Sequence, residues 1–456
     1  MTPRAKSGAS AAFSPARLAE ALARLPTMQR FWVAFSGGAD SLALLHAMCA
    51  LREQLEPAEI RAAHVHHGLQ AEADAWEDDC RRVCTELNVT LETLRVDAGA
   101  GSGESPEAAA RRARYTALAA LVGAGEVMCT AHHRRDQAET LLLQLVRGAG
   151  PAGLAGMPAL APLGKGWLAR PLLETRPDSL RDYLMCQGAT WTEDPSNAEQ
   201  RYDRNYVRQV ILPSLEKRWP GVQRTLARAA AHQADSATIA AELAEMDLSD
   251  ARGTQPGTLS SPALVRLSAA RARNLLRYWL AERGLPLAGA THIGNIVEEL
   301  VKAREDAEPL VSWPGAEVRR YRDALYASPP MPSHDASRII VWSPGQVLEL
   351  THGSIEAATA EGRGISVERC RRARVEVRFR QGGERLQPAG RGHSTALKKL
   401  LQSSAVAPWL RDRIPLIYVD GELAAIAGLL VADAFAADER SRGWVIRWSE
   451  LPGQAA

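Results

Sequence analysis

The chain has 456 residues, more than one ordinary hydrophobic core accommodates, which predicts two or three domains. Its 46% hydrophobic and 24% charged residues are typical of a globular protein. No apolar run reaches membrane-spanning length, so we expect no membrane partner. The net charge of +2 excludes a global electrostatic field, so any nucleic-acid binding has to rest on local basic patches.

Cysteine usage and the N-terminal residues indicate the compartment. Six cysteines without a CxxC pair predict reduced thiols and a cytoplasmic protein. Residues 1–17 carry Arg, Lys and Ser without acids, which is faintly typical of a transit peptide. Because Ala and Arg are abundant throughout the chain, we favour an unstructured start before a short helix over 15–25.

An apolar run over 31–35 leads into Ser36-Gly37-Gly38-Ala39-Asp40-Ser41, after which leucines recur at helical spacing. This pattern predicts a strand, a glycine turn and the N-terminus of a helix. Backbone N–H groups and the helix dipole converge at such a turn, which makes it an anion site. Asp40 either complements the dipole or, in a phosphate site, holds the ligand through a divalent cation.

The loop is neither a Walker A sequence nor a GxGxxG fingerprint. It matches Ser-Gly-Gly-x-Asp-Ser, the pyrophosphate-binding loop of enzymes that cleave ATP to AMP and pyrophosphate. An ordinary strand–turn–helix corner is the alternative interpretation. The motif favours ATP as a ligand and leaves the second substrate open.

The same alternation continues along the first part of the chain. Further strands are expected over 60–65, 89–96 and 126–131, and helices over 72–87, 105–122 and 136–146, with a Gly- and Ser-rich loop over 99–105 and Ser105 as an N-cap. Strands that alternate with helices predict an α/β fold with a doubly wound parallel sheet. Ligands of such sheets bind at the carboxyl ends of the strands.

Polar residues follow these strands. His64 and His66 end the second strand, and because zinc would need a third ligand we interpret His64 as lining the nucleotide site. Asp136 and Glu139 follow the fourth strand, next to His133, and share one helix face. Complementation of the helix dipole is the alternative role of the two carboxylates.

Basic residues form two further groups in this part of the chain. Arg111 and Arg114 share a helix face from which Arg112 is turned away, and a solvated face is the alternative interpretation. The second group is a stripe on one helix face with tyrosines between its members, and it consists of Arg201, Arg204 and Arg208. Such a face can bind the phosphates of a nucleic acid and stack on its bases.

From residue 220 the pattern changes. Ala-rich segments over 222–246 and 261–283 predict an all-helical middle domain, and short strands from residue 338 predict a small mixed α+β C-terminal domain; the latter are expected over 338–342, 346–350, 375–379, 416–419 and 423–430. The expected domains are therefore 1–219, 220–330 and 331–456. Residues 361–413 contain 13 Lys or Arg and 5 Asp or Glu, which favours a nucleic-acid surface.

The order of these motifs resembles the tRNA(Ile)-lysidine synthetases, a family of the N-type ATP pyrophosphatase superfamily, in its long form. Besides the pyrophosphate loop, the resemblance covers 64–69, 110–115, 131–140, 147–157, 170–173 and 191–208. It continues in the C-terminal part with 382–391, 397–401 and Pro408-Trp409.

The resemblance implies the reaction and the partners. ATP, with Mg2+, would adenylate the 2-carbonyl oxygen of the wobble cytidine in the CAU anticodon of tRNA(Ile), and the ε-amine of free L-lysine would displace AMP to give lysidine. The implied catalytic residues are Asp40, Asp136, Glu139, His133 and Arg112; nucleotide-binding residues are Ser36, Gly37, Gly38, Ala39, Asp40, Ser41 and His64, with Asp40 also the metal ligand. The residues implied to contact tRNA are Arg111, Arg114, Arg201, Arg204, Arg208, Arg385, Arg391, Lys398 and Lys399. A homodimer is a further expectation.

One position departs from the family pattern. Many members have two aspartates before the Gln of the His-His-x-Asp-Asp-Gln run, and here the first is Arg135, which we expect to face phosphate. Three alternatives stay open: a tRNA thiolation enzyme, which should need paired reactive cysteines; a small-molecule ligase, which should not need the basic patch; and a tRNA-binding protein without catalysis, which would release no AMP.

Overall fold

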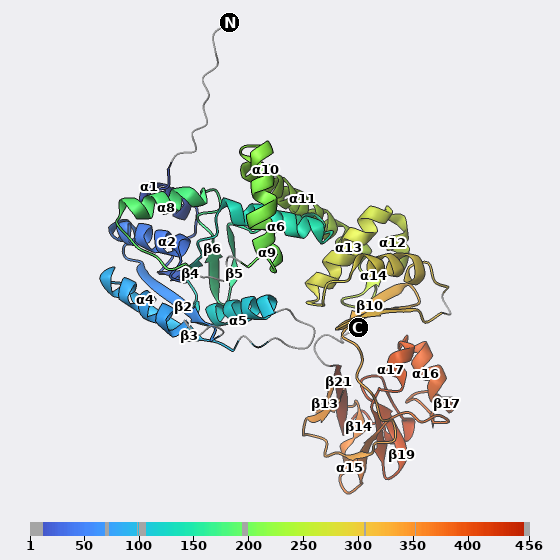
Figure 1. Ribbon diagram of the computed structural model, residues 1–456. Helices are drawn as coiled ribbons and strands as arrows, with labels where there is room; N and C mark the ends of the chain where they lie inside the picture. The colour runs from blue at the N-terminus through green and yellow to red at the C-terminus, as the bar shows by residue number, and fades with distance from the viewer. Residues whose placement is uncertain are drawn as a thin grey trace. The chain divides into compact units, whose positions relative to one another are not determined.

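The computed structural model describes residues 12–68, 73–97, 99, 106–193, 199–304, 307–351 and 353–450 (Figure 1). The chain divides into two compact units between Ile239 and Ala240. The expected loop over 99–105 and its Ser105 N-cap lie outside the described residues except for Gly99, as do residues 1–11 of the expected unstructured start. None of the helices in the described part of the chain combines the length and apolarity needed to cross a membrane.

The first unit is built on a six-stranded sheet. Its strands are β1 Arg30–Ala34, β2 Glu59–His66, β3 Thr90–Arg95, β4 Glu126–Cys129, β5 Leu160–Leu163 and β6 Gly166–Ala169. They lie in the order β3-β2-β1-β4-β6-β5 and are parallel except for β5, which runs antiparallel to β6. From β1 the chain builds outward to β2 and β3 and then returns to β4 on the other side, so the topological switch point lies between β1 and β4. The predicted doubly wound α/β fold is confirmed.

Helices cover both faces of this sheet because the side chains of β1 alternate between two cores. Phe31 and Val33 pack in one cluster with Leu42, and Trp32 packs in a second cluster with Leu118. The helices of this part of the chain are α1 Pro15–Leu22, α2 Ala39–Ala50, α3 Arg52–Leu55, α4 Ala73–Glu86, α5 Pro106–Leu121, α6 Arg134–Val146, α7 Pro151–Leu154 and α8 Pro177–Cys186. Leu42 belongs to α2 and Leu118 to α5, so these two helices cover opposite faces of the sheet.

A second helical stretch follows the sheet. It consists of α9 Asp203–Tyr206, the π-helical turn η2 Val207–Ile211, α10 Leu212–Arg218 and α11 Val222–Ala251. Val207 and Leu212 pack with Ala138 of α6 in a small core. This packing fixes α9 and η2 beside the N-terminal half of α6, at the carboxyl end of β4.

The middle region contains a small sheet in addition to the expected helices. The helical elements are α12 Ser261–Arg266, α13 Ala269–Glu282, α14 Ala290–Asn295 and the π-helical turn η3 Ile296–Leu300, and the strands are β7 Leu259–Ser260, β8 Leu310–Trp313, β9 Ala316–Tyr321 and β10 Ala324–Ser328. The strands form an antiparallel sheet in the order β7-β10-β9-β8. The helix expected over 261–283 is two helices, because the Ser268 side chain accepts a hydrogen bond from the Arg271 N–H and caps a new N-terminus.

The C-terminal part is a mixture of antiparallel sheets and short helices, as expected. Its strands are β11 Ile340–Val341, β12 Leu348–Leu350, β13 Gly353–Glu361, β14 Ile365–Ser366, β15 Val375–Arg378, β16 Arg385–Leu386, β17 Thr395–Ala396, β18 Leu416–Val419, β19 Glu422–Ile426, β20 Leu430–Val431 and β21 Arg442–Glu450. The helical elements are α15 Val367–Cys370, α16 Leu397–Ser403, α17 Pro408–Arg411 and the 3-10 turn η4 Asp433–Phe435. The sequence analysis missed β13 and β21, which pair along their whole lengths. The alanines and glutamates of β13 have low β-propensity, so long-range pairing decides this element.

Candidate active site

The loop between β1 and α2 has the geometry of an anion site. Gly37 has a φ of +83°, which favours glycine, and a Cβ atom at this position would lie 3.2 Å from Cys80 Sγ, a tight contact that the thiol would have to relieve by a small shift. The Ser41 hydroxyl donates to the Gly38 carbonyl at 3.0 Å and accepts from the Ser36 N–H at 3.2 Å. These bonds close the loop on the N-terminus of α2, where the helix has no side-chain cap.

The carboxylate pair lies at the N-terminus of α6. His133 is the N-cap residue, and its ring Nδ1 accepts from the backbone N–H of Asp136 at 3.4 Å. The backbone N–H of His133 donates in return to Asp136 Oδ2 at 2.9 Å. Asp136 is buried, and the Glu139 side chain is 0% exposed. The predicted shared face of the two carboxylates is therefore turned into the protein rather than toward solvent.

Arg204 and Arg208 bind this carboxylate pair. Arg204 Nε donates to Glu139 Oε2 at 2.7 Å and its Nη2 donates to Asp136 Oδ1 at 3.0 Å. Arg208 Nε donates to Glu139 Oε1 at 2.7 Å, and its Nη2 donates to Asp136 Oδ1 at 3.2 Å. Two guanidinium groups thus neutralise two carboxylates, which is the arrangement that buried charges require.

Electrostatics reflect this pairing. Burial by itself would raise the pKa of Asp136. The charges of His133 and Arg204 outweigh this effect of burial and lower the pKa to about 2. Burial would likewise lower the pKa of Arg208, and its hydrogen bond to Glu139 leaves the pKa above the usual value. Asp136 is therefore an ionised carboxylate in this arrangement.

His133 also joins the carboxylates to the pyrophosphate loop. Its Nδ1 accepts the N-cap bond and lies 3.1 Å from Asp136 Oδ2, which leaves Nε2 on the other side of the ring to face the loop. This nitrogen lies 3.4 Å from Oδ2 of Asp40, in the first turn of α2. The structure therefore brings Asp40, His133, Asp136 and Glu139 into one continuous cluster at the switch point of the sheet.

Comparisons with known proteins identify the family. The PP-loop domain model matches residues 13–215, the TilS substrate binding domain model 259–326 and the TilS substrate C-terminal domain model 375–448. The tRNA(Ile)-lysidine synthase of Methylococcus capsulatus is 44% identical over 420 residues, covering 91% of this chain and 95% of that protein. The chain belongs to the tRNA(Ile)-lysidine synthase family.

Two further tRNA(Ile)-lysidine synthases have similar identity and coverage. The one from Coxiella burnetii is 38% identical and covers 96% of this chain and 97% of its own length. The one from Alkalilimnicola ehrlichii is 42% identical, and the match covers 93% of this chain and 95% of that protein. The family predicted from the motifs is confirmed, and with it the expectation of an ATP-using ligase.

The cysteine thiols bear on the thiolation alternative. Sulfur transfer through a protein thiol needs a thiolate. Burial raises the pKa of each of Cys80, Cys84 and Cys129 to about 12, and the pKa of Cys370 to about 11. Thiolates are therefore disfavoured at these four buried positions, whereas Cys49 is half-buried and Cys186 is exposed. The thiolation alternative is not favoured because the relatives reported above are tRNA(Ile)-lysidine synthases.

Three residues that the sequence analysis did not assign lie at the same edge of the sheet. Thr130 follows β4, and its hydroxyl is 2.8 Å from Nδ1 of His132. Burial, with the charges of Arg170 and other arginines, lowers the pKa of His132 to about 3, so this imidazole is neutral. Arg170 follows β6, is buried, and donates from Nη1 to the Pro158 carbonyl at 2.8 Å. The signal that could have found them is position, since Thr130 and Arg170 directly follow strands of the parallel sheet and His132 comes two residues after Thr130.

The other predicted residues of this part of the chain lie on β2 and on α5. His64 is buried with Nδ1 3.0 Å from the Phe35 carbonyl oxygen and 3.5 Å from Cys80 Sγ, so it supports the strand that leads into the loop. The basic residues of α5, which are Arg111, Arg112 and Arg114, are exposed. Arg111 stacks on Tyr115 at 4.9 Å from the ring centroid.

The arginine stripe expected over 201–208 is divided. Arg204 and Arg208 bind the buried carboxylates described above. The Arg201 side chain, by contrast, is 70% exposed and donates to the Tyr202 hydroxyl at 2.9 Å. Arg135, expected to face phosphate, lies with Nε 3.9 Å from Glu139 Oε1. Sequence spacing placed these arginines on a surface but did not show that buried carboxylates bind two of them.

His66 has acidic neighbours that the sequence did not reveal. Its Nε2 is 3.1 Å from Asp74 Oδ1, and Glu77 lies in the same group. Glu77, however, already pairs with Arg95 at 2.8 Å and with Arg81 at 2.7 Å. Since these guanidinium groups neutralise the acid, the group is an ion-pair network around the end of β2.

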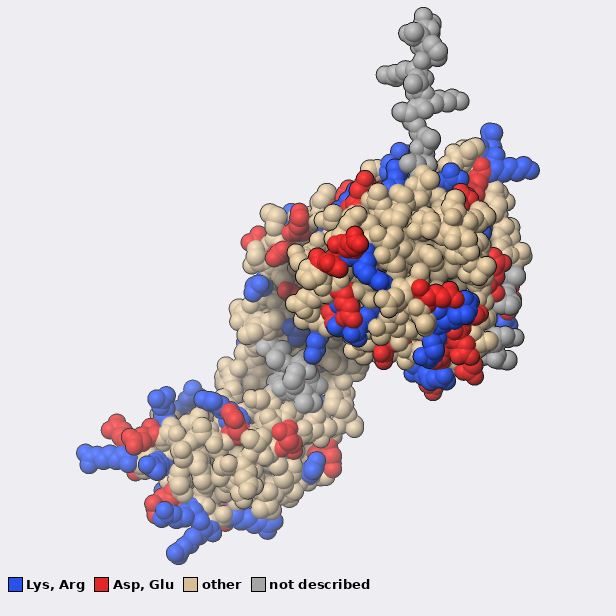
Figure 2. Space-filling model, turned by 90° about the vertical axis from the view of Figure 1, so that its left-hand side faces the viewer, with Lys and Arg blue, Asp and Glu red and all other residues tan. Residues whose placement is uncertain are grey.

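The C-terminal residues implied to contact tRNA are all exposed; they are Arg385 on β16, Arg391, and Lys398 and Lys399 on α16. Figure 2 shows many exposed Lys and Arg side chains on the C-terminal part, with some Asp and Glu side chains among them. Arg385 donates from Nη2 to the Ser394 carbonyl at 2.7 Å, which ties β16 to the turn before β17. Exposed basic side chains of this kind are what phosphate contacts need.

Proposed function

We propose that this chain ligates L-lysine to the 2-position of the wobble cytidine in the CAU anticodon of tRNA(Ile), converting ATP to AMP and pyrophosphate. The relatives reported above carry the name of this activity. The observation that carries the proposal for this chain is the continuous cluster that joins Asp40 of the pyrophosphate loop, through His133, to Asp136 and Glu139. The cluster supports the proposal because a loop suited to bind ATP phosphates and carboxylates suited to bind an amine are joined through one histidine.

The first half-reaction is adenylation of the cytidine carbonyl oxygen. An amide-like carbonyl is a poor electrophile, so activation as an adenylate is chemically necessary before an amine can attack. The backbone of residues 36–41 would hold the leaving pyrophosphate, and Arg112 would neutralise charge that develops there. The half-exposed carboxylate of Asp40 is a ligand type that magnesium prefers, and it lies at the anion site; bound Mg2+ would offset phosphate charge.

The second half-reaction needs a neutral lysine amine. We propose that the lysine ammonium binds at Asp136 and Glu139 in exchange for the guanidinium groups of Arg204 and Arg208. The ammonium replaces the guanidinium as the charged partner of Asp136, and transfer of one ammonium proton to this carboxylate leaves the neutral amine that attacks. His133, hydrogen-bonded to the same carboxylate, keeps Asp136 oriented during the exchange.

The tRNA would contact basic residues outside this cluster. We propose Arg111, Arg114 and Arg201 for the anticodon arm, whose wobble base must be unstacked to reach the site. The exposed basic residues of the C-terminal part, which are Arg385, Arg391, Lys398 and Lys399, would bind phosphates elsewhere on the tRNA. The division into domains 1–219, 220–330 and 331–456, a homodimer and a cytoplasmic location stay predictions.

The experiment is incorporation of labelled L-lysine into a CAU-anticodon tRNA(Ile) transcript with ATP and Mg2+. We expect one lysine per tRNA and an equal yield of AMP. A methionine tRNA transcript with the same anticodon is the matched control and should accept far less lysine. Sulfur transfer, or ligation of lysine to a free small molecule in place of tRNA, would contradict the proposal.

A further inference from the structure

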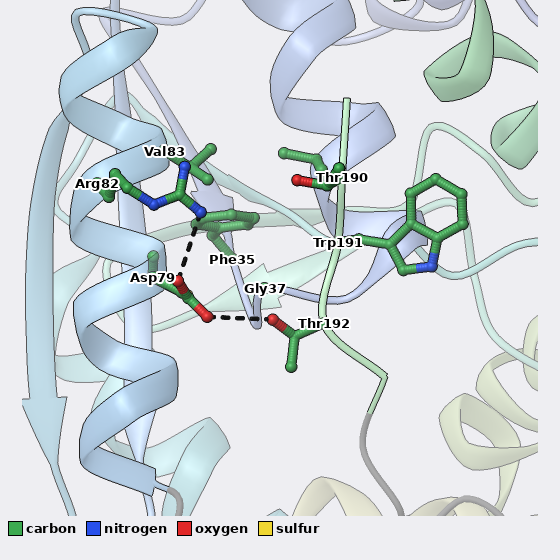
Figure 3. A pocket seen from close by; sticks show the side chains of 10 residues that line it. Phe35, Gly37, Asp79, Arg82, Val83, Thr190, Trp191 and Thr192 are labelled. Atoms are coloured by element: carbon green, nitrogen blue, oxygen red, sulfur yellow. Dashed lines mark hydrogen bonds and ion pairs between the residues drawn. The ribbon is translucent and has the colours of Figure 1, made fainter. Parts of the chain in front are cut away.

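A small cavity lies directly beside the pyrophosphate loop (Figure 3). Its volume is about 170 Å³, and its lining includes Gly37 of the loop, Asp79 and Cys80 of α4, and the segment Thr190-Trp191-Thr192. That segment follows α8 and leads toward α9, which carries Arg204. The cavity therefore lies where the segment that follows α8 passes the pyrophosphate loop.

Thr192 makes two contacts across this cavity. Its backbone N–H donates to the Gly37 carbonyl at 3.3 Å, and its hydroxyl donates a long hydrogen bond to Asp79 Oδ2 at 3.4 Å. Asp79 in turn accepts from Arg82 at 3.4 Å on the same helix, as the dashed lines in Figure 3 show. Thr192 thus ties the tip of the loop to α4, although it lies far from both in the sequence.

The bond to Gly37 determines where the next N–H points. In a trans peptide the C=O and the N–H of one unit point in opposite directions. Because the Gly37 carbonyl is turned toward Thr192, the Gly38 N–H is directed away from the cavity. Gly38 is the N-cap residue of α2, and in the described part of the chain no protein group accepts a hydrogen bond from its N–H. This donor is left for a ligand at the N-terminus of α2.

We propose that Thr192 is a positioning residue for the pyrophosphate loop: it holds the Gly37–Gly38 peptide in the orientation that presents the Gly38 N–H to a phosphate oxygen. The inference rests on the proposed function, in which this loop binds the phosphates of ATP. Thr192 itself touches no substrate. Its role is to hold the Gly38 N–H in the orientation that binds phosphate, so that the Gly37–Gly38 peptide does not have to rotate when ATP binds.

The first test compares Thr192→Val with Thr192→Ser in the full-length protein. Valine keeps the shape but removes the hydroxyl anchor, so we expect the KM for ATP to rise about fivefold. The kcat and the KM for lysine should change by less than about twofold, a split that general damage to the fold would not produce. Thr192→Ser keeps the hydroxyl and should restore the KM for ATP.

The second test uses the partner of that hydroxyl. Asp79→Ala should raise the KM for ATP as Thr192→Val does, and the double variant should be no worse than either single variant, because both remove one contact. Arg82→Ala is the matched control, since it removes the other partner of Asp79 and leaves Thr192 in place. Thr192→Pro, which deletes the backbone donor itself, should have the largest effect.

Folding of each variant is checked by thermal unfolding, and Asp79→Ala replaces any Thr192 variant that does not fold. An unchanged KM for ATP in folded Thr192→Val and Asp79→Ala would overturn the inference. Calorimetric titration of the unaltered protein with ATP and Mg2+ distinguishes failure of this inference from failure of the proposed function. A protein that binds ATP through this loop but forms no lysidine refutes only the proposed reaction, and one that binds no ATP refutes both.

Discussion

Arg204 Nε donates to Glu139 Oε2 at 2.7 Å, joining two residues that are 65 positions apart in the sequence. Glu139 is on α6 and Arg204 is on α9, so the bond fixes the start of the second helical stretch against the carboxyl end of β4. A second guanidinium, that of Arg208, binds the other carboxylate oxygen of Glu139. Stability and chemistry therefore depend on the same side chain.

Glu139→Gln should destabilise the protein and abolish lysine transfer. The Glu139 side chain is 0% exposed, so the substitution leaves two guanidinium groups that share the single carboxylate of Asp136. Removing one partner of a buried ion pair costs about 3 kcal/mol, here reduced because both arginines are partly exposed. Urea unfolding measures the loss. Glu242→Gln, an exposed acid on α11, is the control and should stay within about 0.5 kcal/mol of the unaltered protein.

Arg201→Ala and Arg204→Ala should affect tRNA differently. Arg201 is exposed, so losing it should weaken tRNA binding and reduce the salt dependence of the affinity by about one phosphate contact. Arg204 is engaged with carboxylates, so its loss should lower kcat with a smaller change in the salt slope. Filter-binding titrations at several salt concentrations test this. An equal change of slope in both variants would show that Arg204 also binds phosphate directly.

Gly37→Ala should impair ATP binding beyond its effect on stability. At a φ of +83°, alanine is strained by about 1–2 kcal/mol, and its Cβ would also meet Cys80 Sγ at 3.2 Å. Gly188→Ala is the matched control, because Gly188 has a φ of +67° but nothing within 4 Å of the added Cβ. Both variants should lose stability, and only Gly37→Ala should raise the KM for ATP. A normal KM in that variant would mean that the loop tolerates a shifted backbone.

His132→Gln should make the stability less sensitive to acid. The folded-state pKa of His132 is lowered to about 3 from an ordinary value of 6.5, so the unfolded chain binds a proton that the folded chain does not. The free energy of unfolding therefore falls as pH drops from 6.5 toward 3, by about 2 kcal/mol at about pH 5 from this group. The variant should lack that loss when urea unfolding at about pH 7.5 and pH 5 is compared. The control is His232→Gln, on the exposed surface of α11; an equal acid response in the two variants would refute the assignment.

Much of this molecule follows from local sequence patterns. Alternating apolar strands and helices predicted the doubly wound sheet, and the run Ser36 to Ser41 predicted the turn at its switch point. Both depend on short-range features, namely periodicity, glycine conformations and helix caps, which a single sequence displays. The expected positions of Asp40, Asp136 and Glu139 at strand ends rest on the same local features.

Tertiary structure decided which charges meet. Spacing predicted a surface stripe of arginines, but burial of Asp136 and Glu139 makes unpaired carboxylates costly, so Arg204 and Arg208 turn inward. The clamp of Thr192 on Gly37 and the pairing of β13 with β21 likewise join residues far apart in the chain. The sequence by itself determined the alternating strands and helices of the first sheet and the family. The desolvation of charges determined which side chains meet in the site, and long-range pairing of backbone groups determined the strands that local patterns did not reveal.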